Sequence, residues 1–280
     1  MGDGGDAGAY DPAMRLLVIG GSGLLGREVV RQARLAGHRV TATAFRRPTG
    51  PRLDIRDRSA VAALVAADNP EVVVNAAYLQ SDWATTADGG MHVAAAAAGC
   101  GARLVHVSSD AVFSGRAPSY AETAAPDPVT PYGAAKAAAE VAVRGLVPAA
   151  AVVRTSLIIG AGDSVTERHV RDLATGRRSG VLFTDDVRCP IHVTDLAAAL
   201  LEFAARPSPG VHHVAGAEAV SRHRLGVLIA RRDGLDESAL RTARRVGSGL
   251  PGAVDVRLDC RATQRRLVTR LRGAGEFLSL

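Results

Sequence analysis

The 280-residue sequence has little of several residue types, and each shortage excludes a class of protein. Its three cysteines, Cys100, Cys189 and Cys260, are odd in number and far apart. They indicate neither a disulfide framework nor a zinc site, and they fit a reducing cytoplasm. No apolar run reaches the roughly 18 residues that cross a bilayer. Residues 1–13 are acidic and glycine-rich without a basic segment, so we expect a disordered extension on a cytoplasmic protein and no secretory signal.

Lysine is the scarcest charged residue. Of the 34 basic residues only Lys136 is a lysine, so the other 33 are arginines. Such a bias is typical of a GC-rich genome, which replaces lysine wherever a generic positive charge suffices. A lysine ammonium can change its pKa where a guanidinium cannot. The position of Lys136 therefore shows where to look for chemistry that needs a lysine.

The overall composition is that of an ordinary globular protein. Hydrophobic residues make up 47% and charged residues 22%, which excludes a disordered chain, a coiled coil and a collagen-like fibre. The net charge of +6 lies mostly in residues 155–280, which carry 19 arginines against 14 acids. That excess indicates either a solvated surface or a field that favours an anionic substrate. No nucleic-acid partner is expected, because the sequence lacks a basic stripe with interleaved aromatics.

Short apolar runs alternate with helical periodicity through the first half of the chain. The runs predict strands over residues 15–19, 39–44, 71–75, 103–108 and 149–153. The segments between them predict helices over residues 24–36, 57–67, 91–98 and 131–146. This alternation predicts βαβ units and an α/β fold with a doubly wound, parallel Rossmann sheet over residues 14–154.

The pattern loosens after about residue 155. Helices are expected over residues 164–175, 194–205 and 222–230, and short strands over residues 180–183, 189–193 and 211–214. No linker separates the two halves. We therefore expect residues 155–280 to form a smaller α/β lobe that packs over the open end of the sheet and binds substrate.

The first strand is followed by a glycine-rich turn that opens a helix. There Gly20 allows a tight turn, Gly23 lets the backbone approach a pyrophosphate, and Gly26 allows close helix–sheet packing. Free N–H groups at the helix N-terminus then face the phosphates. This predicts a dinucleotide-binding loop made of Gly20, Ser22, Gly23, Leu24, Leu25 and Gly26. The alternative is a glycine turn of purely structural use.

The segment after the second strand bears on which cofactor binds. NAD sites usually carry an acid about 20 residues beyond the glycines, and this segment has none. Arg46 or Arg47 would instead pair with a 2′-phosphate, so we expect NADPH rather than NADH. The alternative is that both are exposed loop arginines. Asp54 and Ile55 are expected to border the adenine, with a turn role as the alternative for Asp54.

A tyrosine and the single lysine stand four residues apart at the start of the long helix. Tyr132 and Lys136 therefore share one helix face, and Ser108 and Ser109 end a strand at the sheet edge where ligands bind. A neighbouring ammonium lowers the pKa of a tyrosine, which is otherwise near 10. A serine can hydrogen-bond a carbonyl as charge develops on its oxygen. This set suits proton transfer beside a hydride donor; a surface tyrosine and lysine is the alternative.

These motifs resemble those of the extended short-chain dehydrogenase/reductases. The resemblance covers nearly all of residues 14–280 and rests on GGSGLLG, VVVNAAY, VHVSSDAVFSG, PYGAAKAAAE, VVRTSLIIG and CPIHVTDLA. Within that superfamily the sequence is most similar to the dTDP-4-dehydrorhamnose reductase family of nucleotide-sugar 4-ketoreductases. The resemblance implies Tyr132 as catalytic acid, Lys136 as its partner and ribose ligand, and Ser109 as the third member of the triad. It also places three residues along the cofactor: Ala76, Ala77 and Tyr78.

Three positions depart from that family's pattern. The helix that usually carries an Asn-Val pair reads MHV around His92, which is either a proton relay or a capping or packing residue. Leu157 stands where rhamnose-forming members often have an aromatic residue, and Ala111 where they commonly have tyrosine. The sugar pocket is therefore open to a different hexose or another carbonyl compound.

The sequence also suggests substrate-side residues, which are Trp83, Asp110 and Arg188. Trp83 is either a pocket wall or a packed core residue. We expect no metal, because the adjacent His212 and His213 point to opposite faces of a strand. For Asp185-Asp186 we expect a loop role, with cation binding as the alternative.

The expected reaction is NADPH-dependent reduction of a keto group, most simply the 4-keto group of an NDP-linked deoxysugar. Two alternatives stay open: a reductase or epimerase of another natural-product carbonyl, and a non-catalytic nucleotide-binding regulatory relative. The expected partner is thus a small-molecule substrate. A homodimer through the helix that carries Tyr132 is common in the superfamily.

Overall fold

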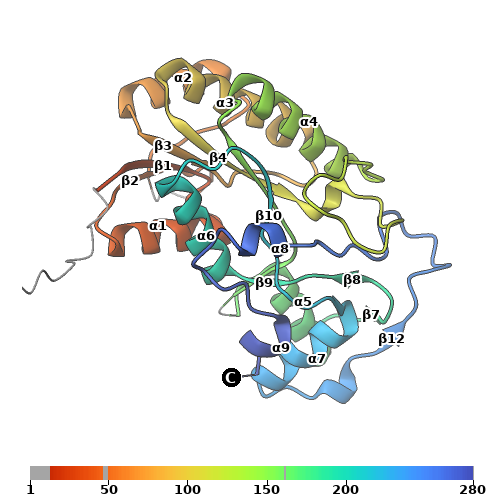
Figure 1. The fold of residues 1–280 in the computed structure, drawn as a ribbon. Coiled ribbons are helices and arrows are strands. Elements are labelled where there is room, and N and C mark those ends of the chain that lie inside the picture. The colour runs from red at the N-terminus through yellow and green to blue at the C-terminus, as the bar shows by residue number, and fades with distance from the viewer. Residues whose placement is uncertain (1–12, 47–49, 161, 280) are drawn as a thin grey trace, which may run out of the picture.

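A computed structural model describes residues 13–46, 50–160 and 162–279 (Figure 1). Apart from Ala13, the expected N-terminal extension lies outside the described residues, and so does Arg47. Among the residues that are described, strands and helices alternate along the chain up to the middle of the sequence, as the periodicity predicts.

A six-stranded parallel sheet forms the centre of the fold, in the order β10-β5-β4-β3-β1-β2. The strands are β1 (Arg15–Ile19), β2 (Arg39–Ala42), β3 (Val72–Asn75), β4 (Arg103–Ser109), β5 (Ala151–Thr155) and β10 (Gly210–His213). Valine and leucine fill the inner strands, and nearly every residue there is buried. Continuous apolar strands of this kind are typical of a parallel sheet covered on both faces. The predicted fold class is confirmed.

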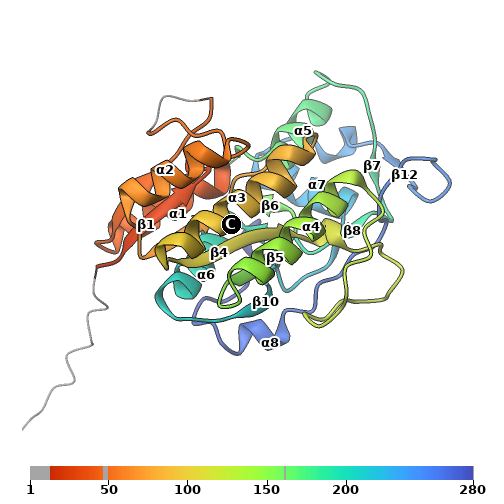
Figure 2. The ribbon, with the colours of Figure 1, turned by 90° about the horizontal axis from the view of Figure 1, so that it is seen from above.

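Helices cover both faces of this sheet (Figures 1 and 2). On one face lie α1 (Leu24–Leu35) and α6 (Val193–Ala205); on the other lie α2 (Arg58–Asp68), α3 (Gly89–Cys100) and α4 (Pro131–Leu146). Each face of the sheet has its own hydrophobic core. Successive residues of β1 contribute to one core and then the other, because side chains alternate across a strand. Leu16 and Val18 pack on the α1 and α6 side, whereas Leu17 and Ile19 pack on the other.

A smaller lobe follows at one end of the sheet (Figure 1). Its elements are β6 (Ile158–Ile159), α5 (Val165–Ala174), β7 (Leu182–Phe183), β8 (Val187–Arg188), β9 (Ile191–His192), β11 (Val220–Ser221), α7 (Arg222–Arg232), β12 (Thr242–Ala243) and α9 (Ala274–Phe277). The short helix α8 (Arg261–Gln264) lies beside β10 instead, where the Thr263 hydroxyl accepts from the His213 backbone N–H at 3.2 Å. A separate hydrophobic cluster, which includes Leu225, Ile229 and Phe277, holds α5, α7 and α9 together.

The two halves of the chain interleave more than the sequence predicts. The predicted division falls at residue 154, yet β10 pairs with β5 and α6 packs against α1. Both elements therefore belong to the sheet and its helical cover. The lobe is built from what remains of residues 155–280. A single strand predicted over residues 189–193 is instead the short β9, preceded by Pro190, which has no N–H to donate to a strand ladder.

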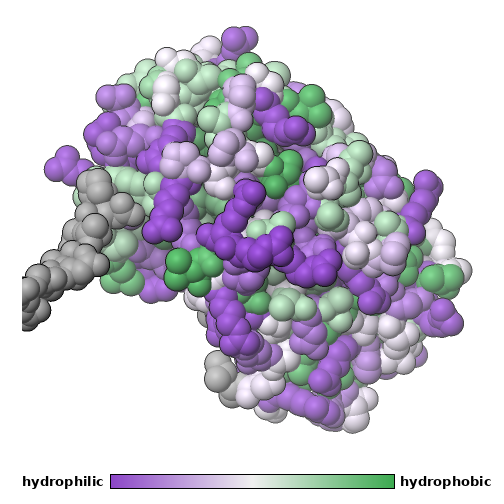
Figure 3. Space-filling model, in the orientation of Figure 1, coloured by the Kyte–Doolittle hydropathy of each residue, from purple (hydrophilic) through white to green (hydrophobic). Residues whose placement is uncertain are grey.

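Hydrophilic side chains spread over the face drawn in Figure 3, and apolar ones occur there in small patches. Several arginines of the C-terminal half pair with acids nearby in sequence, such as Arg257 with Asp255 at 2.9 Å and Arg261 with Asp259 at 2.6 Å. This pairing favours the interpretation of the charge excess as a solvated surface. Among the described residues, no helix has the length and apolar character that crossing a membrane requires.

Candidate active site

The glycine-rich turn lies where the strand order reverses. In the sheet, β2 lies on one side of β1 and β3 lies on the other. The carboxyl ends of β1 and β3 therefore flank a switch point, which is where sheets of this kind bind ligands. Gly20 has a φ of +83°, and a Cβ there would lie 2.8 Å from the backbone nitrogen of Ala77. A Cβ at Gly26 would overlap the Gly20 carbonyl oxygen. Both positions require glycine for the turn itself.

The start of α1 is open to an anion. Gly23 is the N-cap and offers no side-chain cap, and no acid lies in the first turn of the helix. A Cβ at Gly23 would meet only the Gly20 carbonyl oxygen, at 3.4 Å. The first N–H groups of a helix have no partner within it and attract negative charge. Ser22 and Leu24 are half-buried beside this turn, whereas the Leu25 side chain belongs to the core. This backbone cradle fits a dinucleotide pyrophosphate.

Three arginines surround one aromatic ring beyond β2. The guanidinium carbons of Arg46, Arg52 and Arg56 lie 5.9, 5.8 and 5.7 Å from the centre of the Phe45 ring. Arg46 is one of the two arginines that the sequence predicts for a 2′-phosphate, the other being Arg47, and Arg52 was missed because it lies six residues beyond Arg46. The cluster gives this end of the turn a positive field, which suits a phosphorylated ribose.

Contacts within the protein hold the side chains of Asp54 and Ile55. The Asp54 carboxylate accepts from the Arg56 backbone N–H at 3.0 Å and from its guanidinium at 2.6 Å. The Arg56 guanidinium lowers the pKa of Asp54. This is the turn role that was the alternative for Asp54. Ile55 is only 4% exposed and packs beneath Gly89, so its side chain serves the core.

Local sequence signals fix the start of α4, which carries two of the predicted catalytic residues. The Thr130 hydroxyl accepts from the Gly133 backbone N–H at 3.1 Å, and Pro131 occupies the first helical position. A Thr cap followed by Pro is a strong helix start. A Cβ at Gly133 would overlap the Ala111 carbonyl oxygen, so this glycine lets α4 approach the end of β4 closely.

Three predicted site residues converge at the carboxyl end of the sheet. The rings of Tyr78 and Tyr132 lie 5.9 Å apart between centres, and the Lys136 Nζ lies 5.1 Å from the centre of the Tyr78 ring. Lys136 is 3% exposed and donates to the Val107 carbonyl at 3.0 Å. Tyr78 is 54% exposed, so the site reaches the surface at this ring. The predicted stretch Ala76–Tyr78 meets the glycine turn, because Gly20 packs on Ala77.

Ser109 is the last residue of β4 and faces the same place. Its hydroxyl accepts from the Ala111 backbone N–H at 3.2 Å and donates to Asp110 at 3.3 Å. The Ser109 hydroxyl lies close enough to Tyr132 to lower the pKa of that phenol. The predicted Ser–Tyr–Lys set is therefore brought together by β4 and α4.

The expected lowering of the Tyr132 pKa is not what the structure shows. Burial raises the pKa of Tyr132, and the neighbouring Tyr78 and Asp110 raise it further, against the opposing hydrogen bond with Ser109. The ammonium of Lys136 points instead to the Val107 carbonyl. Burial lowers the pKa of Lys136 to about 8, a shift that Glu140 opposes. The phenol of Tyr132 is thus protonated at neutral pH.

The three residues predicted to contact substrate differ in whether their side chains are exposed or are already bonded within the fold. Trp83 is 50% exposed at the start of a π-helical turn, Ala84–Asp88, so it is no core residue. Asp110 accepts from the Ser156 hydroxyl at 2.6 Å. Arg188 lies 3.7 Å from Asp110 and 2.9 Å from Asp186, and it donates to three backbone carbonyls. Its guanidinium is therefore largely engaged within the fold.

Three candidate functional features of the sequence have structural roles in the fold. His92 bonds the Ile55 carbonyl through Nδ1 at 3.0 Å, which favours the packing interpretation. The two adjacent histidines face opposite sides, with His212 stacked on Phe203 and His213 edge-on to Phe113. Asp186 pairs with arginines, and no cluster of three or more potential metal ligands occurs in the described parts of the chain.

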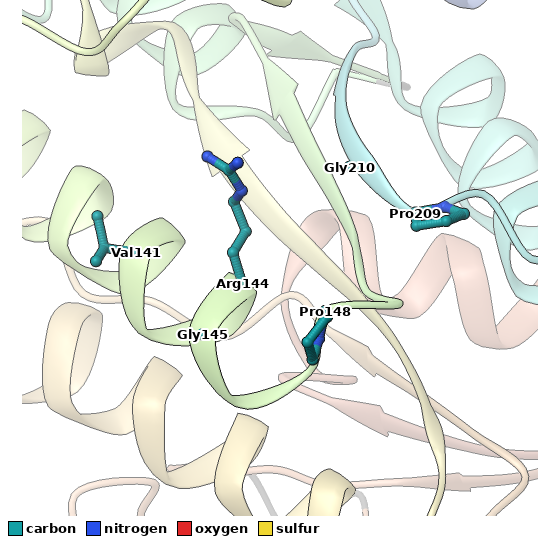
Figure 4. Close-up of a pocket in the computed structure, with 6 residues that line it drawn as sticks. All are labelled: Val141, Arg144, Gly145, Pro148, Pro209 and Gly210. Carbon is teal, nitrogen blue, oxygen red and sulfur yellow. The ribbon is translucent and has the colours of Figure 1, made fainter.

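Two surface hollows lie apart from this site. One of about 490 Å³ separates the end of α4 from the segment before β10 (Figure 4), and Arg144 extends beside it while Pro148 and Pro209 line it from two loops. The other, of about 290 Å³, lies between α2 and α3 and is lined mainly by alanine, with His92. Neither includes Tyr132, Lys136 or Ser109, so the chemistry is not located there.

Sequence reasoning missed a buried group behind the triad. Glu140 follows Lys136 by one turn of α4, and Arg154 on β5 pairs with it at 2.7 Å. The i, i+4 spacing from Lys136 to Glu140 was the available signal, since it repeats the spacing from Tyr132 to Lys136. No pattern in the sequence around Arg154 indicated that this residue of β5 would pair with Glu140.

A family model and several known proteins match most of this chain. Residues 14–272 match the family model for the RmlD substrate binding domain. The dTDP-4-dehydrorhamnose reductase of Mycolicibacterium smegmatis is 36% identical over 224 residues, which cover 75% of this chain and 66% of that protein. Methionine adenosyltransferase 2 subunit beta of Xenopus laevis is 31% identical over 272 residues, 89% of this chain and 81% of that protein.

Solved structures share the fold. The dTDP-4-dehydrorhamnose reductase of Bacillus anthracis, crystallised in complex with NADP, superposes with a TM-score of 0.85 at 22% identity. The match covers 95% of this chain and 98% of that one. At this identity the likeness establishes the architecture, including the Rossmann sheet and the attached lobe.

Proposed function

The chain belongs to the RmlD substrate binding domain family, of the extended short-chain dehydrogenase/reductase type. From that premise we propose that it is an NAD(P)-dependent oxidoreductase that reduces the 4-keto group of an NDP-linked deoxysugar, with NADPH as its cofactor. The observation that carries the proposal is the convergence of Tyr132, Lys136 and Ser109 beside the glycine turn. A nucleotide cradle and a proton donor at one sheet edge are what carbonyl reduction needs.

Each residue of the site has a separate role in this reaction. When bound, the nicotinamide cofactor supplies the hydride to the keto carbon. Ser109 donates a hydrogen bond to the keto oxygen and orients it. Tyr132 then transfers its phenolic proton to that oxygen as negative charge develops there. The Lys136 ammonium stabilises the phenolate that remains, because an opposite charge nearby favours the ionised form.

The proposed cofactor contacts follow from the cradle. Gly20, Gly23 and the N-terminus of α1 would hold the pyrophosphate, since the first N–H groups of α1 have no partner within the helix and no side chain caps them. Arg46 and Arg52 would hold the 2′-phosphate that distinguishes NADPH from NADH. Relatives of known structure are described with NADP and with NAD. The arginines around Phe45 are what favours NADPH here.

The substrate class is proposed from relatives. A MoeE5 structure is described in complex with UDP-glucose and NAD, and the Mycolicibacterium smegmatis relative is named for a dTDP-sugar. The exposed Tyr78 and Trp83 provide apolar surface beside Tyr132 for a nucleotide sugar to contact.

The replacement Tyr132→Phe tests the proposal. It removes the transferable proton and keeps the ring, so NADPH oxidation across a panel of NDP-4-keto-sugars should fall to background while the Kd for NADPH stays unchanged. Tyr120→Phe is the matched control, because the Tyr120 hydroxyl lies 3.4 Å from Ser114 in a different cluster. Retained turnover in the Tyr132→Phe protein would refute the catalytic assignment.

A second candidate function rests on the 31% identity to a methionine adenosyltransferase subunit. In that case the chain would bind a nucleotide and regulate a partner enzyme without reducing any substrate. Wild-type protein that binds NADPH tightly yet oxidises it with no keto sugar or other carbonyl of the panel would favour this alternative. Turnover with a non-sugar carbonyl alone would instead favour a different natural-product reductase.

A further inference from the structure

A buried ion pair lies behind the proposed catalytic residues. The Arg154 guanidinium donates to both oxygens of the Glu140 carboxylate, at 2.7 Å to Oε2 and 2.9 Å to Oε1. The Ser108 hydroxyl donates to the same carboxylate at 2.5 Å, and Arg154 also donates to the Ala124 carbonyl at 3.1 Å. The two charged side chains are 2% and 3% exposed. The pair is thus fully enclosed and well supplied with hydrogen bonds.

A contribution to the stability of the fold does not by itself explain why an ion pair is buried here. Taking two charges out of water costs several kcal/mol per ion, and well-packed hydrophobic residues often serve a core as well or better. Glu140 lies four residues after Lys136 and therefore on the same side of α4. Its charge is buried one turn from the only lysine of the chain.

The surroundings of Lys136 contain few groups that favour its charged form. The groups that face it are Tyr132 and Glu140 from α4, the Tyr78 ring after β3, and His106 and the Val107 carbonyl on β4. Of these described groups, only Glu140 carries a negative charge. Burial lowers the pKa of Lys136 to about 8, and Glu140 opposes that lowering. Burial and the nearby ammonium lower the pKa of His106 to about 3, so it stays neutral.

We propose that Glu140, held by Arg154 and Ser108, is a positioning residue that keeps Lys136 in the ammonium form at the proposed active site. Arg154 holds the Glu140 carboxylate in place, and Glu140 is the charged group that acts on the pKa of Lys136. Ser108 ties the same carboxylate to the residue before Ser109, so the ion pair also braces the end of β4. The purpose of this arrangement rests on the proposed function, because a charged lysine is needed there only if Tyr132 must ionise.

The single lysine makes the proposal directly measurable. Biosynthetic labelling with [ε-13C]lysine places one label in the protein, at Lys136. Its NMR shift against pH reports the ionisation of that amine without any substrate. Wild-type protein should titrate near pH 8. Glu140→Gln removes the charge, keeps the side-chain shape and retains one of the two acceptor oxygens, and it should lower the midpoint by on the order of one pH unit or more. Glu140→Asp should restore much of the difference, because it retains the charge.

Controls separate this effect from a structural one. Glu71→Gln removes an equivalent charge at an exposed site, 43% exposed and paired with Arg15, and should leave the midpoint unchanged. Should Glu140→Gln fail to fold with Arg154 unpaired, the double variant Glu140→Gln/Arg154→Met leaves no lone charge in the core. It should again lower the midpoint. A Lys136 midpoint equal to that of wild type in the folded variant would overturn the proposal.

The pH dependence of activity is measured separately from the NMR titration of Lys136. If the proposed function holds, the alkaline limb of the kcat/KM profile should move to lower pH by the same amount as the NMR midpoint. Wild-type protein that reduces no keto sugar would count against the proposed function only. The NMR midpoint would still decide whether Glu140 sets the charge of Lys136.

Discussion

A methyl group at Gly23 should separate nucleotide binding from folding. Gly23 has φ −74° and ψ 170°, an extended conformation that any residue adopts. A Cβ there would meet only the Gly20 carbonyl oxygen, at 3.4 Å, which is ordinary van der Waals contact. Gly23→Ala is therefore expected to change the free energy of unfolding by less than about 1 kcal/mol.

The same methyl should strongly weaken NADPH binding. It would stand at the exposed start of α1, between the first N–H groups of the helix and an approaching pyrophosphate. A hydrogen bond to a charged group contributes about 1.5–3 kcal/mol. The loss of one such bond corresponds to a rise in Kd of roughly 10- to 150-fold.

Two measurements on the same preparations test this reasoning. The Kd comes from NADPH fluorescence titration, and the free energy of unfolding comes from urea denaturation. Gly99→Ala is the control, because Gly99 lies in α3 with nothing within 4 Å of its would-be Cβ. It should stabilise the fold by about 1 kcal/mol and leave the Kd unchanged. Wild-type NADPH affinity in folded Gly23→Ala protein would refute the assignment of this turn to the phosphates.

Three further predictions follow from the site. Lys136→Arg should lower kcat about 100-fold or more, since the fork of a guanidinium cannot replace a compact ammonium there; near-normal turnover with keto sugars would contradict this. Arg154→Met should lower the free energy of unfolding by about 3–5 kcal/mol because it leaves Glu140 unpaired, and a urea midpoint like that of wild type would argue against a buried charge. Arg46→Ala should raise the Kd for NADPH about tenfold more than that for NADH, whereas equal changes would exclude a role at the 2′-phosphate.

Local signals predicted the catalytic parts of the fold well. The α4 helix occurs over the predicted residues 131–146, because Thr130 and Pro131 mark its start. The first strand and the glycine turn also appear as predicted, since short-range spacing determines both. Residues that share one helix or follow one strand can be placed from sequence alone. This is why Tyr132 and Lys136 were found on one face.

Pairings between distant segments could not be predicted in the same way. Arg154 finds Glu140 only once β5 lies beneath α4, and Tyr78 reaches Lys136 only when β3 and β4 are paired. The placement of Asp54 as a turn residue depends on its contact with Arg56, which the sequence allows but does not require. The π-helical turn Ala84–Asp88 has no composition signal. The rise in the Tyr132 pKa likewise comes from burial, a property of the assembled fold.

The membership of β10 in the central sheet has a consequence for how the protein is made. A nascent chain that ends at residue 154 lacks both that edge strand and α6, which covers one face of the sheet. Val74 and Val105, which lie on strands that α6 contacts in the complete fold, would then lack that cover. At about 5–20 residues per second, the ribosome takes roughly 3–12 s to add the 59 residues from 155 to 213. During that interval the half-built sheet exposes apolar surface that only the C-terminal half of the chain can cover.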